Sequence, residues 1–181
     1  EIAIPIWGDN KIIKSRYHDN TTRNVRKALK SVEVIISDDF KAYWVLLEKC
    51  LLERHGKRPA HDIDSIMKLR EHLSNDEILL FAAYYNHKLM GGIVVFNFGS
   101  LGLHAQYVAS DSAFRHLNPV HAIIDHVIDW GNKRGVKYLN LGMANEDNGK
   151  KINSGLLRFK ESFGGRGVLR ETMSRNIHDY Q

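Results

Sequence analysis

The sequence has little of what several classes of protein require. Its 181 residues include one cysteine, Cys50, so a disulfide bond within the chain is excluded. Cys50 lies in a leucine-rich segment, 46–52, and is interpreted as a small buried hydrophobic side chain. No apolar run is long enough to span a membrane, and no signal-peptide pattern opens the chain. The chain begins at Glu1 and not at methionine, which we interpret as an excised domain or a processed product.

Signatures of metal binding and of a nucleophile are missing too. His116, His121 and His126 are separated by steps of five residues, and this step does not place side chains on one face of a helix. We therefore expect no metal site. The sequence also lacks the motifs that surround a catalytic serine or cysteine.

What is present is the composition of a globular domain. Hydrophobic residues make up 43% of the chain and charged residues 26%. The length suffices for one domain with a sizeable core. The 26 basic and 21 acidic residues give a net charge of +5, which is a mild bias towards anionic partners.

Hydrophobic periodicity predicts a mixed α/β domain. A proline in the first segment favours the edge or the end of a strand. The Asn86-His87 turn predicts a hairpin, and Gly91-Gly92 predicts a bulge or a close backbone approach. Asn118-Pro119 predicts the start of a long helix, with Asn118 as its cap. The predicted helices cover 22–31, 38–55, 62–73, 119–135 and 154–163, and the predicted strands cover 1–6, 32–36, 77–85, 88–96, 101–110, 136–141 and 168–175.

The order of these elements predicts the sheet. Strands 77–85, 88–96 and 101–110 are expected to form an antiparallel meander. A strand, a crossover helix and a second strand, 136–141, then favour a right-handed parallel unit. The last strand, 168–175, is expected to return antiparallel.

The first long helix carries a basic stripe. Its residues Arg23, Arg26, Lys27 and Lys30 recur at helical spacing, while Val25, Ala28 and Leu29 occupy the other side. Such a stripe is often a solvated helix face, but this one lacks the interspersed acidic residues that usually balance it. Contact with phosphate or nucleic acid is therefore an equal alternative, and it would weaken steeply with salt.

The segment 154–165 combines an apolar stripe with a lysine. Leu156, Phe159 and Phe163 share one face of a short helix that Ser154 is expected to cap and that Gly164-Gly165 end. Lys160 lies within this stripe and not opposite it. Its stem can simply cover apolar surface. Alternatively, its ammonium group is held beside a cleft to meet negative charge.

Several phrases resemble the Fem-type transferases, a branch of the GNAT acyltransferase superfamily. The Phe159-Lys160-x-x-Phe163-Gly164 motif is similar to the one near the end of those proteins. Four further segments resemble parts of the Fem-like branch. Residues 22–28 are similar to its early basic helix and residues 107–111 to the end of its central strand. Residues 117–119 are similar to the start of its main helix and residues 138–142 to the strand before the motif. The resemblance runs from about residue 20 to residue 170. It implies the GNAT fold, either as a single domain over 1–181 or as the C-terminal half of a longer two-domain protein, in the bacterial cytoplasm.

One departure from the superfamily concerns the acyl donor. Acetyl-coenzyme A users carry a glycine-rich loop after the central strand, whose N–H groups hold the pyrophosphate. Here the loop 110–117 has no glycine, and Asp111 adds negative charge. Arg115 and the helix start near Asn118 can still hold a phosphate. The donor is therefore expected to be acetyl-coenzyme A or another acyl donor, bound as a co-substrate and not covalently.

Acyl transfer to an amine requires a base, a polarised carbonyl and a satisfied leaving group. Alternation places Leu103, Ala105 and Tyr107 on one face of strand 101–110 and His104 on the other. His104 is a candidate base, and Tyr107 either protonates the leaving group or packs in the core. The resemblance implies that Lys160 stabilises the developing negative charge. The candidate substrate- and cofactor-binding residues are Arg23, Lys27, Arg115, Asn118, Arg158, Phe159 and Phe163.

Two functional classes remain open. The first is an N-acyltransferase that transfers an acetyl or acyl group from a coenzyme A thioester to an amine on a small molecule, glycan or peptide. The alternative is a Fem-type transferase that uses aminoacyl-tRNA on a cell-wall or glycan precursor, or a non-catalytic half of such an enzyme. In the first class, Lys160→Met should abolish transfer and change stability by less than about 1 kcal/mol, as expected for a surface residue.

Overall fold

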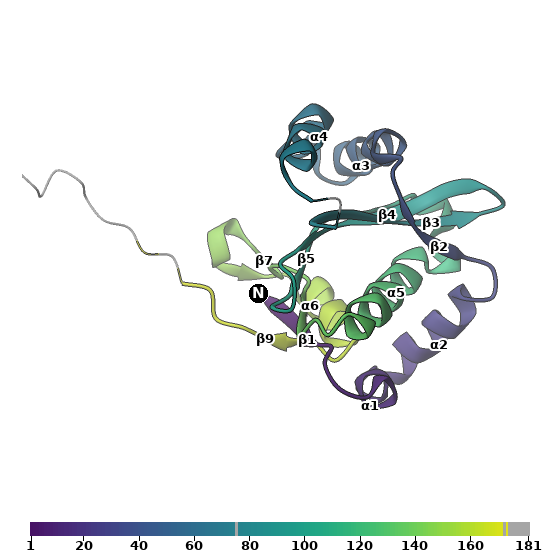
Figure 1. Ribbon diagram of the computed structural model, residues 1–181, viewed down its shortest axis with the longest axis vertical. Helices are drawn as coiled ribbons and strands as arrows, with labels where there is room; N and C mark the ends of the chain where they lie inside the picture. The colour runs from purple at the N-terminus through teal and green to yellow at the C-terminus, as the bar shows by residue number, and fades with distance from the viewer. Residues whose placement is uncertain (75, 172, 174–181) are drawn as a thin grey trace, which may run out of the picture.

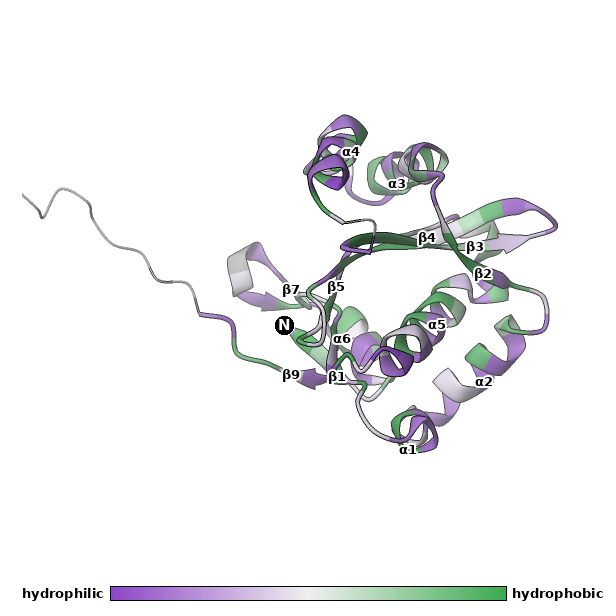
Figure 2. Ribbon diagram, in the orientation of Figure 1, coloured by the Kyte–Doolittle hydropathy of each residue, from purple (hydrophilic) through white to green (hydrophobic). Residues whose placement is uncertain are grey.

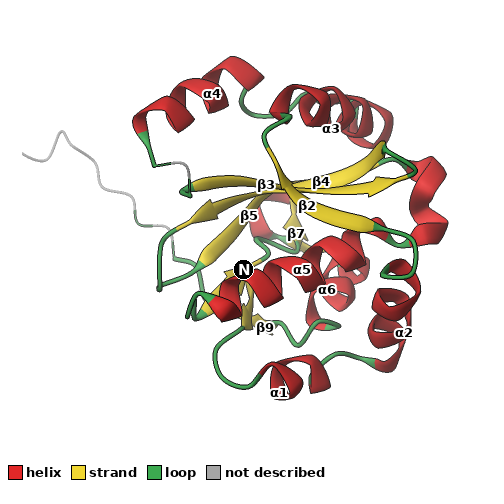
Figure 3. Ribbon diagram, turned by 45° about the vertical axis from the view of Figure 1, so that its right-hand side comes forward, coloured by secondary structure: helices red, strands yellow, loops and turns green. Residues whose placement is uncertain are grey.

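A seven-stranded mixed sheet lies between two layers of helices (Figures 1 and 3). The structure is a computed structural model, and it describes residues 1–74, 76–171 and 173. The strands of this sheet are β1 (Ile2–Pro5), β2 (Glu33–Ser37), β3 (Ile78–Tyr85), β4 (Lys88–Asn97), β5 (Leu103–Ser110), β6 (Tyr138–Asn140) and β9 (Arg166–Gly167). A separate hairpin contains β7 (Asn145–Glu146) and β8 (Lys151–Ile152). The helices are α1 (Asn10–Ser15), α2 (Asp19–Ala28), α3 (Phe40–His55), α4 (Ile63–His72), α5 (Pro119–Lys133) and α6 (Ser154–Glu161), with the 3-10 turns η1 (Ser112–Leu117) and η2 (Asp147–Gly149).

The strand order confirms the predicted mixed architecture. It runs β2-β3-β4-β5-β6-β1-β9 across the sheet. Strands β2 to β5 are antiparallel neighbours, and β5 pairs in parallel with β6 across the crossover helix α5. β1 lies between β6 and β9 and is antiparallel to both. Pro5 therefore stands at the end of a strand, as one of the two alternatives predicted, but that strand is not at the edge.

Each face of the sheet has its own apolar cluster. Helix α5 buries Ile123, Val127 and Ile128 on one face, with α2 outside it. Helix α3 buries Tyr43, Trp44 and Leu47 on the other face, next to α4. Figure 2 shows hydrophobic strands between helices whose outer surfaces are largely hydrophilic. The apolar stripes read from the sequence thus fix which side of each helix meets the sheet.

The central hairpin was predicted correctly. Asn86 and His87 both have positive φ, 48° and 60°, as a two-residue hairpin turn of this kind requires. The pairing of β3 with β4 shifts by one residue near Gly91, so the predicted bulge is present. The predicted close approach is present too, because a Cβ atom on Gly91 would lie 2.8 Å from the carbonyl oxygen of Ala109.

A second bulge was not predicted, and it corrects the expected faces of β5. Val94 pairs with Tyr107 and Val95 pairs with Ala105, so Gln106 is an extra residue in β5. Because a bulge reverses the alternation beyond it, Leu103 and Ala105 belong to the α5 cluster, while Tyr107 belongs to the α3 cluster. The prediction that these three side chains share a face is wrong.

Two predicted helix caps are also corrected. Helix α6 is capped by Asn153, whose Oδ1 accepts from the N–H of Leu156 at 2.9 Å, and Ser154 is its first helical residue. Asn118 precedes α5 as predicted, but it is left-handed with φ 55° and its side chain makes no capping hydrogen bond. Its carbonyl oxygen accepts from the N–H groups of His121 and Ala122, which are the first backbone hydrogen bonds of the helix.

The last strand lies earlier than predicted. It is β9, Arg166–Gly167, and it is antiparallel to β1 as expected. Residues 168–171 and 173 form no strand, and 172, 174 and 175 lie outside the described residues.

Gly92 offers a test of the packing beneath the β5 bulge. A Cβ atom there would lie 2.7 Å from two ring carbons of Tyr43, whose buried hydroxyl donates to the carbonyl groups of Gly92 and Tyr107 at 3.1 and 3.0 Å. We expect Gly92→Ala to lower the free energy of unfolding by about 1–3 kcal/mol, because Tyr43 must move.

The matched control is Gly167→Ala, since a Cβ atom at Gly167 meets no atom within 4 Å. Urea denaturation should show a change within about 0.5 kcal/mol for this variant. Equal stability of the two variants would contradict the packing role assigned to Tyr43.

Candidate active site

A cleft of 1040 Å³ opens where β5 and β6 separate. These strands pair only through Leu103 with Leu139 and His104 with Asn140. Beyond Asn140 the chain follows β1 instead, since the N–H of Leu141 donates to the carbonyl oxygen of Ile2 at 2.8 Å. Past His104, therefore, the β6-facing edge of β5 has no strand partner among the described residues, and its backbone groups face the cleft.

The walls of the cleft come from distant parts of the sequence. They include the start of α5, one side of α6, the end of α3 and the segment that follows β6. The ionisable residues that line it are Glu1, Arg54, His55, His104, Arg115, His121, Lys160 and Arg170.

Lys160 is the most buried of the basic residues in the cleft. The residue is only 7% exposed, and its Nζ donates to the carbonyl oxygen of Met143 at 2.5 Å. The prediction that Lys160 lies within the apolar stripe of α6 is thus confirmed. The expectation that it behaves as a surface residue is wrong, because α6 presses it against the segment that follows β6.

Burial sets the protonation of Lys160. It lowers the pKa of Lys160 to about 8, although the nearby carboxylate of Glu1 acts in the opposite direction. A hydrogen bond from Asn140 lowers the pKa of Glu1, helped by the charges of Arg170 and His104. At neutral pH the cleft therefore holds a poorly solvated ammonium group, whose remaining N–H donors are available to a ligand.

Two histidines line the same cleft. His104 lies at the last position where β5 pairs with β6, and a carbon of its ring lies near Gly142. His121, in the first turn of α5, packs edge-on against Phe159 with ring centroids 5.3 Å apart. Burial lowers the pKa of His121, so its ring is neutral at neutral pH. Its Nε2 lies 3.3 Å from the side-chain nitrogen of Asn24 on α2.

The turn after β5 differs from an open anion-binding loop. The carboxylate of Asp111 already accepts the N–H of Ala113 at 2.9 Å and pairs with Lys49 at 3.3 Å. At the start of α5, Pro119 has no N–H. The N–H groups of His121 and Ala122 both donate to the carbonyl of Asn118. The backbone donors at this turn are thus largely occupied by the protein itself.

The structure brings five of the sequence-predicted residues to the cleft. These are His104, Arg115, Asn118, Phe159 and Lys160.

The other predicted residues lie elsewhere. Tyr107 packs on the α3 side against Trp44, with ring centroids 5.1 Å apart, and its hydroxyl group bonds to His61. Phe163 is fully buried beneath the cleft. Arg23, Lys27 and Arg158 are exposed and do not line it.

Sequence reasoning missed several residues of the cleft. Arg54 and His55 end α3, and His121 and Glu1 were not assigned any role. No local pattern marks them, because their proximity depends on how α3 and β1 dock on the sheet. For His121, its place three residues after Asn118 in a helix start was the only available signal.

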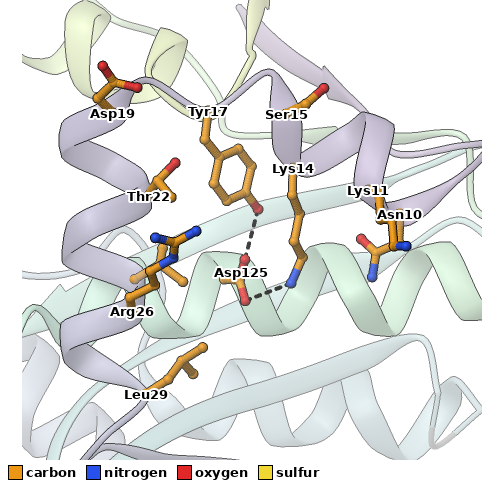
Figure 4. Close-up of a pocket in the computed structure, with 11 residues that line it drawn as sticks. Asn10, Lys11, Lys14, Ser15, Tyr17, Asp19, Thr22, Arg26, Leu29 and Asp125 are labelled. Atoms are coloured by element: carbon orange, nitrogen blue, oxygen red, sulfur yellow. Dashed lines mark hydrogen bonds and ion pairs between the residues drawn. The ribbon is translucent and has the colours of Figure 1, made fainter.

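A second cavity, of 580 Å³, lies between α1, α2 and α5 (Figure 4). Lys14 and Tyr17 point from the α1 side towards Asp125, with contacts of 3.0 Å each. Lys14 also pairs with Asp129 at 2.8 Å. Because Asp125 is buried and both its oxygens have partners, this network ties the N-terminal helices to α5.

Within residues 1–74, 76–171 and 173, no cluster of three or more histidine, cysteine or acidic side chains is placed to hold a metal ion. No helix in the same part of the chain is long and apolar enough to cross a membrane.

Comparison with known families identifies the fold. Residues 15–160 match the family described as the acetyltransferase (GNAT) domain. The chain therefore belongs to the GNAT acetyltransferase domain family, as the resemblance predicted. This family transfers acyl groups to amines and uses acyl-coenzyme A as its donor. Comparison with curated proteins gives no sequence match.

Solved structures share this fold at low sequence identity. FemX superposes with a TM-score of 0.75 and 16% identity over 91% of this chain and 58% of its own. The C-terminal domain of a putative lysylphosphatidylglycerol synthetase from Agrobacterium fabrum superposes with a TM-score of 0.64 and 11% identity. The match covers 91% of this chain and 55% of that one. A GNAT family acetyltransferase from Elizabethkingia anophelis with acetyl-CoA bound superposes with a TM-score of 0.52 and 14% identity over 74% of each chain. This chain spans less than two thirds of the length of the first two of these proteins.

The lowered pKa of Lys160 predicts a pH dependence of stability. The unfolded chain has a lysine of pKa 10.5 where the folded chain has one of about 8, so the unfolded state binds more protons between these values. Stability contributed by this group therefore rises with pH from about 8 to 10.5. The difference in the free energy of unfolding between the wild type and Lys160→Met should change by about 1–3 kcal/mol across this pH range.

Urea denaturation at pH 7.5 and 9.5 measures this difference. Lys137→Met, at an exposed lysine, is the control and should show no such change. A pH-independent difference for Lys160→Met would contradict the burial of a charged Lys160.

Proposed function

We propose that this domain is an N-acyltransferase whose reaction takes place in the cleft between β5 and α6. The observation that carries the proposal is the position of Lys160: a buried ammonium group beside an unpaired edge of β5. Together they supply cationic and backbone donors at one place, as stabilisation of an oxyanion requires.

The chemistry follows from these groups. The acceptor amine attacks the carbonyl carbon of the donor, and the carbonyl oxygen gains negative charge. Backbone N–H groups of β5 and the Nζ of Lys160 then donate to this oxygen. Collapse of the intermediate breaks the bond to the donor's leaving group, which takes up a proton, and forms the amide.

The amine must lose a proton to attack, and His104 is the proposed base. It lies in the cleft where β5 leaves β6, next to Gly142. The electrostatic interaction of Glu1 with both His104 and Lys160 supports placing these two groups in one catalytic centre.

Lys160→Met tests the proposal. Loss of one oxyanion donor lowers kcat by about 10²–10³-fold in comparable sites. We expect this loss in single-turnover transfer of the acyl group to an amine, while Lys137→Met retains the wild-type rate. Unchanged turnover of Lys160→Met would remove this lysine from the mechanism.

For the donor, acyl-coenzyme A follows from the family, and the donor-binding residues are proposed to include Arg115, Asn118 and Phe159. A second candidate is an aminoacyl-tRNA acting on a glycan or cell-wall precursor. One observation favours it: at the turn where a pyrophosphate would bind, the carboxylate of Asp111 already accepts the N–H of Ala113, and Pro119 has no N–H to offer. Arg23 and Lys27 on the exposed face of α2, with Lys30 in the turn that follows it, then offer a surface for RNA phosphates.

Thermal unfolding separates the two donors. At a hundred times its dissociation constant a ligand adds about 2.7 kcal/mol to stability. We expect acetyl-coenzyme A to raise the midpoint by several degrees and adenosine diphosphate to have no effect. No shift with acetyl-coenzyme A, together with salt-sensitive protection by aminoacyl-tRNA, would select the second candidate.

A further inference from the structure

Four large apolar side chains are exposed at the end of the sheet that lies away from the cleft. They are Trp7, Phe98, Leu101 and Tyr138, with exposed fractions of 56%, 61%, 72% and 45%. We call these four residues the end patch. Single exposed apolar residues are ordinary on a protein surface, whereas a group of them marks a site of interaction. None of the four lines either of the two cavities described above, so the proposed reaction does not account for them.

Two residues of the end patch come from neighbouring strands. Tyr138 begins β6 and pairs with Pro5, the last residue of β1. The N–H of Ile6 then donates to the carbonyl oxygen of Lys137 at 2.9 Å, so the two segments stay together up to the residue before Trp7. Trp7 and Tyr138 are therefore held close to each other, at the opposite end of β1 from the cleft.

The turn between β4 and β5 brings the other two residues to the same end of the sheet. The N–H of Phe98 donates to the carbonyl oxygen of Gly102 at 2.9 Å, which closes the turn that carries Leu101. The N–H of Lys137 donates to the carbonyl oxygen of Ser100 at 3.1 Å. The turn is therefore fixed against the segment that enters β6, next to Tyr138.

The surface around the end patch is basic. The segment that leads from α5 into β6 exposes three basic residues, Lys133, Arg134 and Lys137. The segments 5–8, 98–102 and 133–138 contain no acidic residue. Asp9, Asp76 and Glu77 flank them, and the carboxylates of Asp9 and Glu77 already accept backbone N–H groups. A partner that covers this end of the molecule therefore meets apolar side chains together with positive charge.

This combination favours a lipid surface over a protein partner. Tryptophan and tyrosine suit the headgroup level of a bilayer, because each has an apolar ring and a polar tip. Leucine and phenylalanine bury their side chains at the boundary with the acyl chains. Lysine and arginine near the surface are attracted by anionic headgroups. Interfaces between proteins, in contrast, are depleted in lysine.

We propose that the end patch binds the surface of an anionic lipid bilayer. Its four side chains enter the headgroup region, and the three basic residues lie beside the lipid phosphates. The cleft, which Glu1 lines at the other end of β1, stays open to the solvent. This inference goes beyond the proposed N-acyltransferase function and does not rest on it.

Trp7 provides a fluorescence probe of this contact, because Trp44 and Trp130 are only 2% and 7% exposed. We expect vesicles of phosphatidylcholine mixed with phosphatidylglycerol to shift the tryptophan emission to the blue, and Trp7→Phe to remove the shift. Vesicles of phosphatidylcholine alone should give a smaller shift, and added salt should weaken the binding. Absence of a shift, or an equal shift with both kinds of vesicle, would overturn the inference.

Cosedimentation with the mixed vesicles locates the contact. Leu101→Ala should lower the partition coefficient at least about tenfold, because it removes buried methylene groups. Lys137→Gln should lower it about fivefold, because one cation near the surface is lost. The matched controls are Leu52→Ala and Lys41→Gln, at exposed positions on α3. Equal partition coefficients for Leu101→Ala and Leu52→Ala would contradict the proposed contact.

Two further outcomes would assign the surface differently. Self-association that Leu101→Ala abolishes, measured by sedimentation equilibrium without lipid, would overturn the inference, since the end patch would then join two copies of the chain. Vesicle binding that Lys27→Gln abolishes and Leu101→Ala leaves intact would overturn it too, since the lipid would then lie on α2. Acyl transfer to a soluble amine should be unchanged in Leu101→Ala, so failure of lipid binding and failure of the proposed function are separate results.

Discussion

The separation of β5 from β6 is the constraint on which the rest of the site depends. Two parallel strands that pair at only two positions leave a backbone edge open in the interior of a sheet. This edge would be costly if it stayed without partners, and a substrate carbonyl is a natural partner for its N–H groups. The separation arises because β6 is three residues long and the chain beyond it bonds to β1.

A buried lysine next to this edge has a defined physical consequence. Desolvation makes the ammonium of Lys160 less stable than in water, so any negative charge that develops nearby is stabilised more strongly than it would be at the surface. The remaining charge of the cleft is also positive. The proposed catalysis thus depends on one feature, a buried cation in a cleft whose other charged side chains are mostly basic.

The sequence predicted what depends on local pattern. The helices α3 and α5, the β3–β4 hairpin and the parallel crossover follow from apolar periodicity and from Asn86-His87 and Asn118-Pro119. Lys160 was found because it interrupts an apolar stripe. The bulge at Gln106 could not be predicted, since it depends on the fit of β5 against β4 and Tyr43. Arg54 and Glu1 reach the cleft only through tertiary docking, which spacing along the chain does not encode.

The most direct test of this account is the titration of Lys160 itself. Carbon-13 NMR of lysine-labelled protein, with Lys160→Arg to assign the signal, reports the protonation of each lysine. The account predicts one lysine with a pKa of about 8, the value that burial in the cleft imposes. A Lys160 signal that titrates at the ordinary value of 10.5 would contradict the buried cation from which the proposed activity is derived.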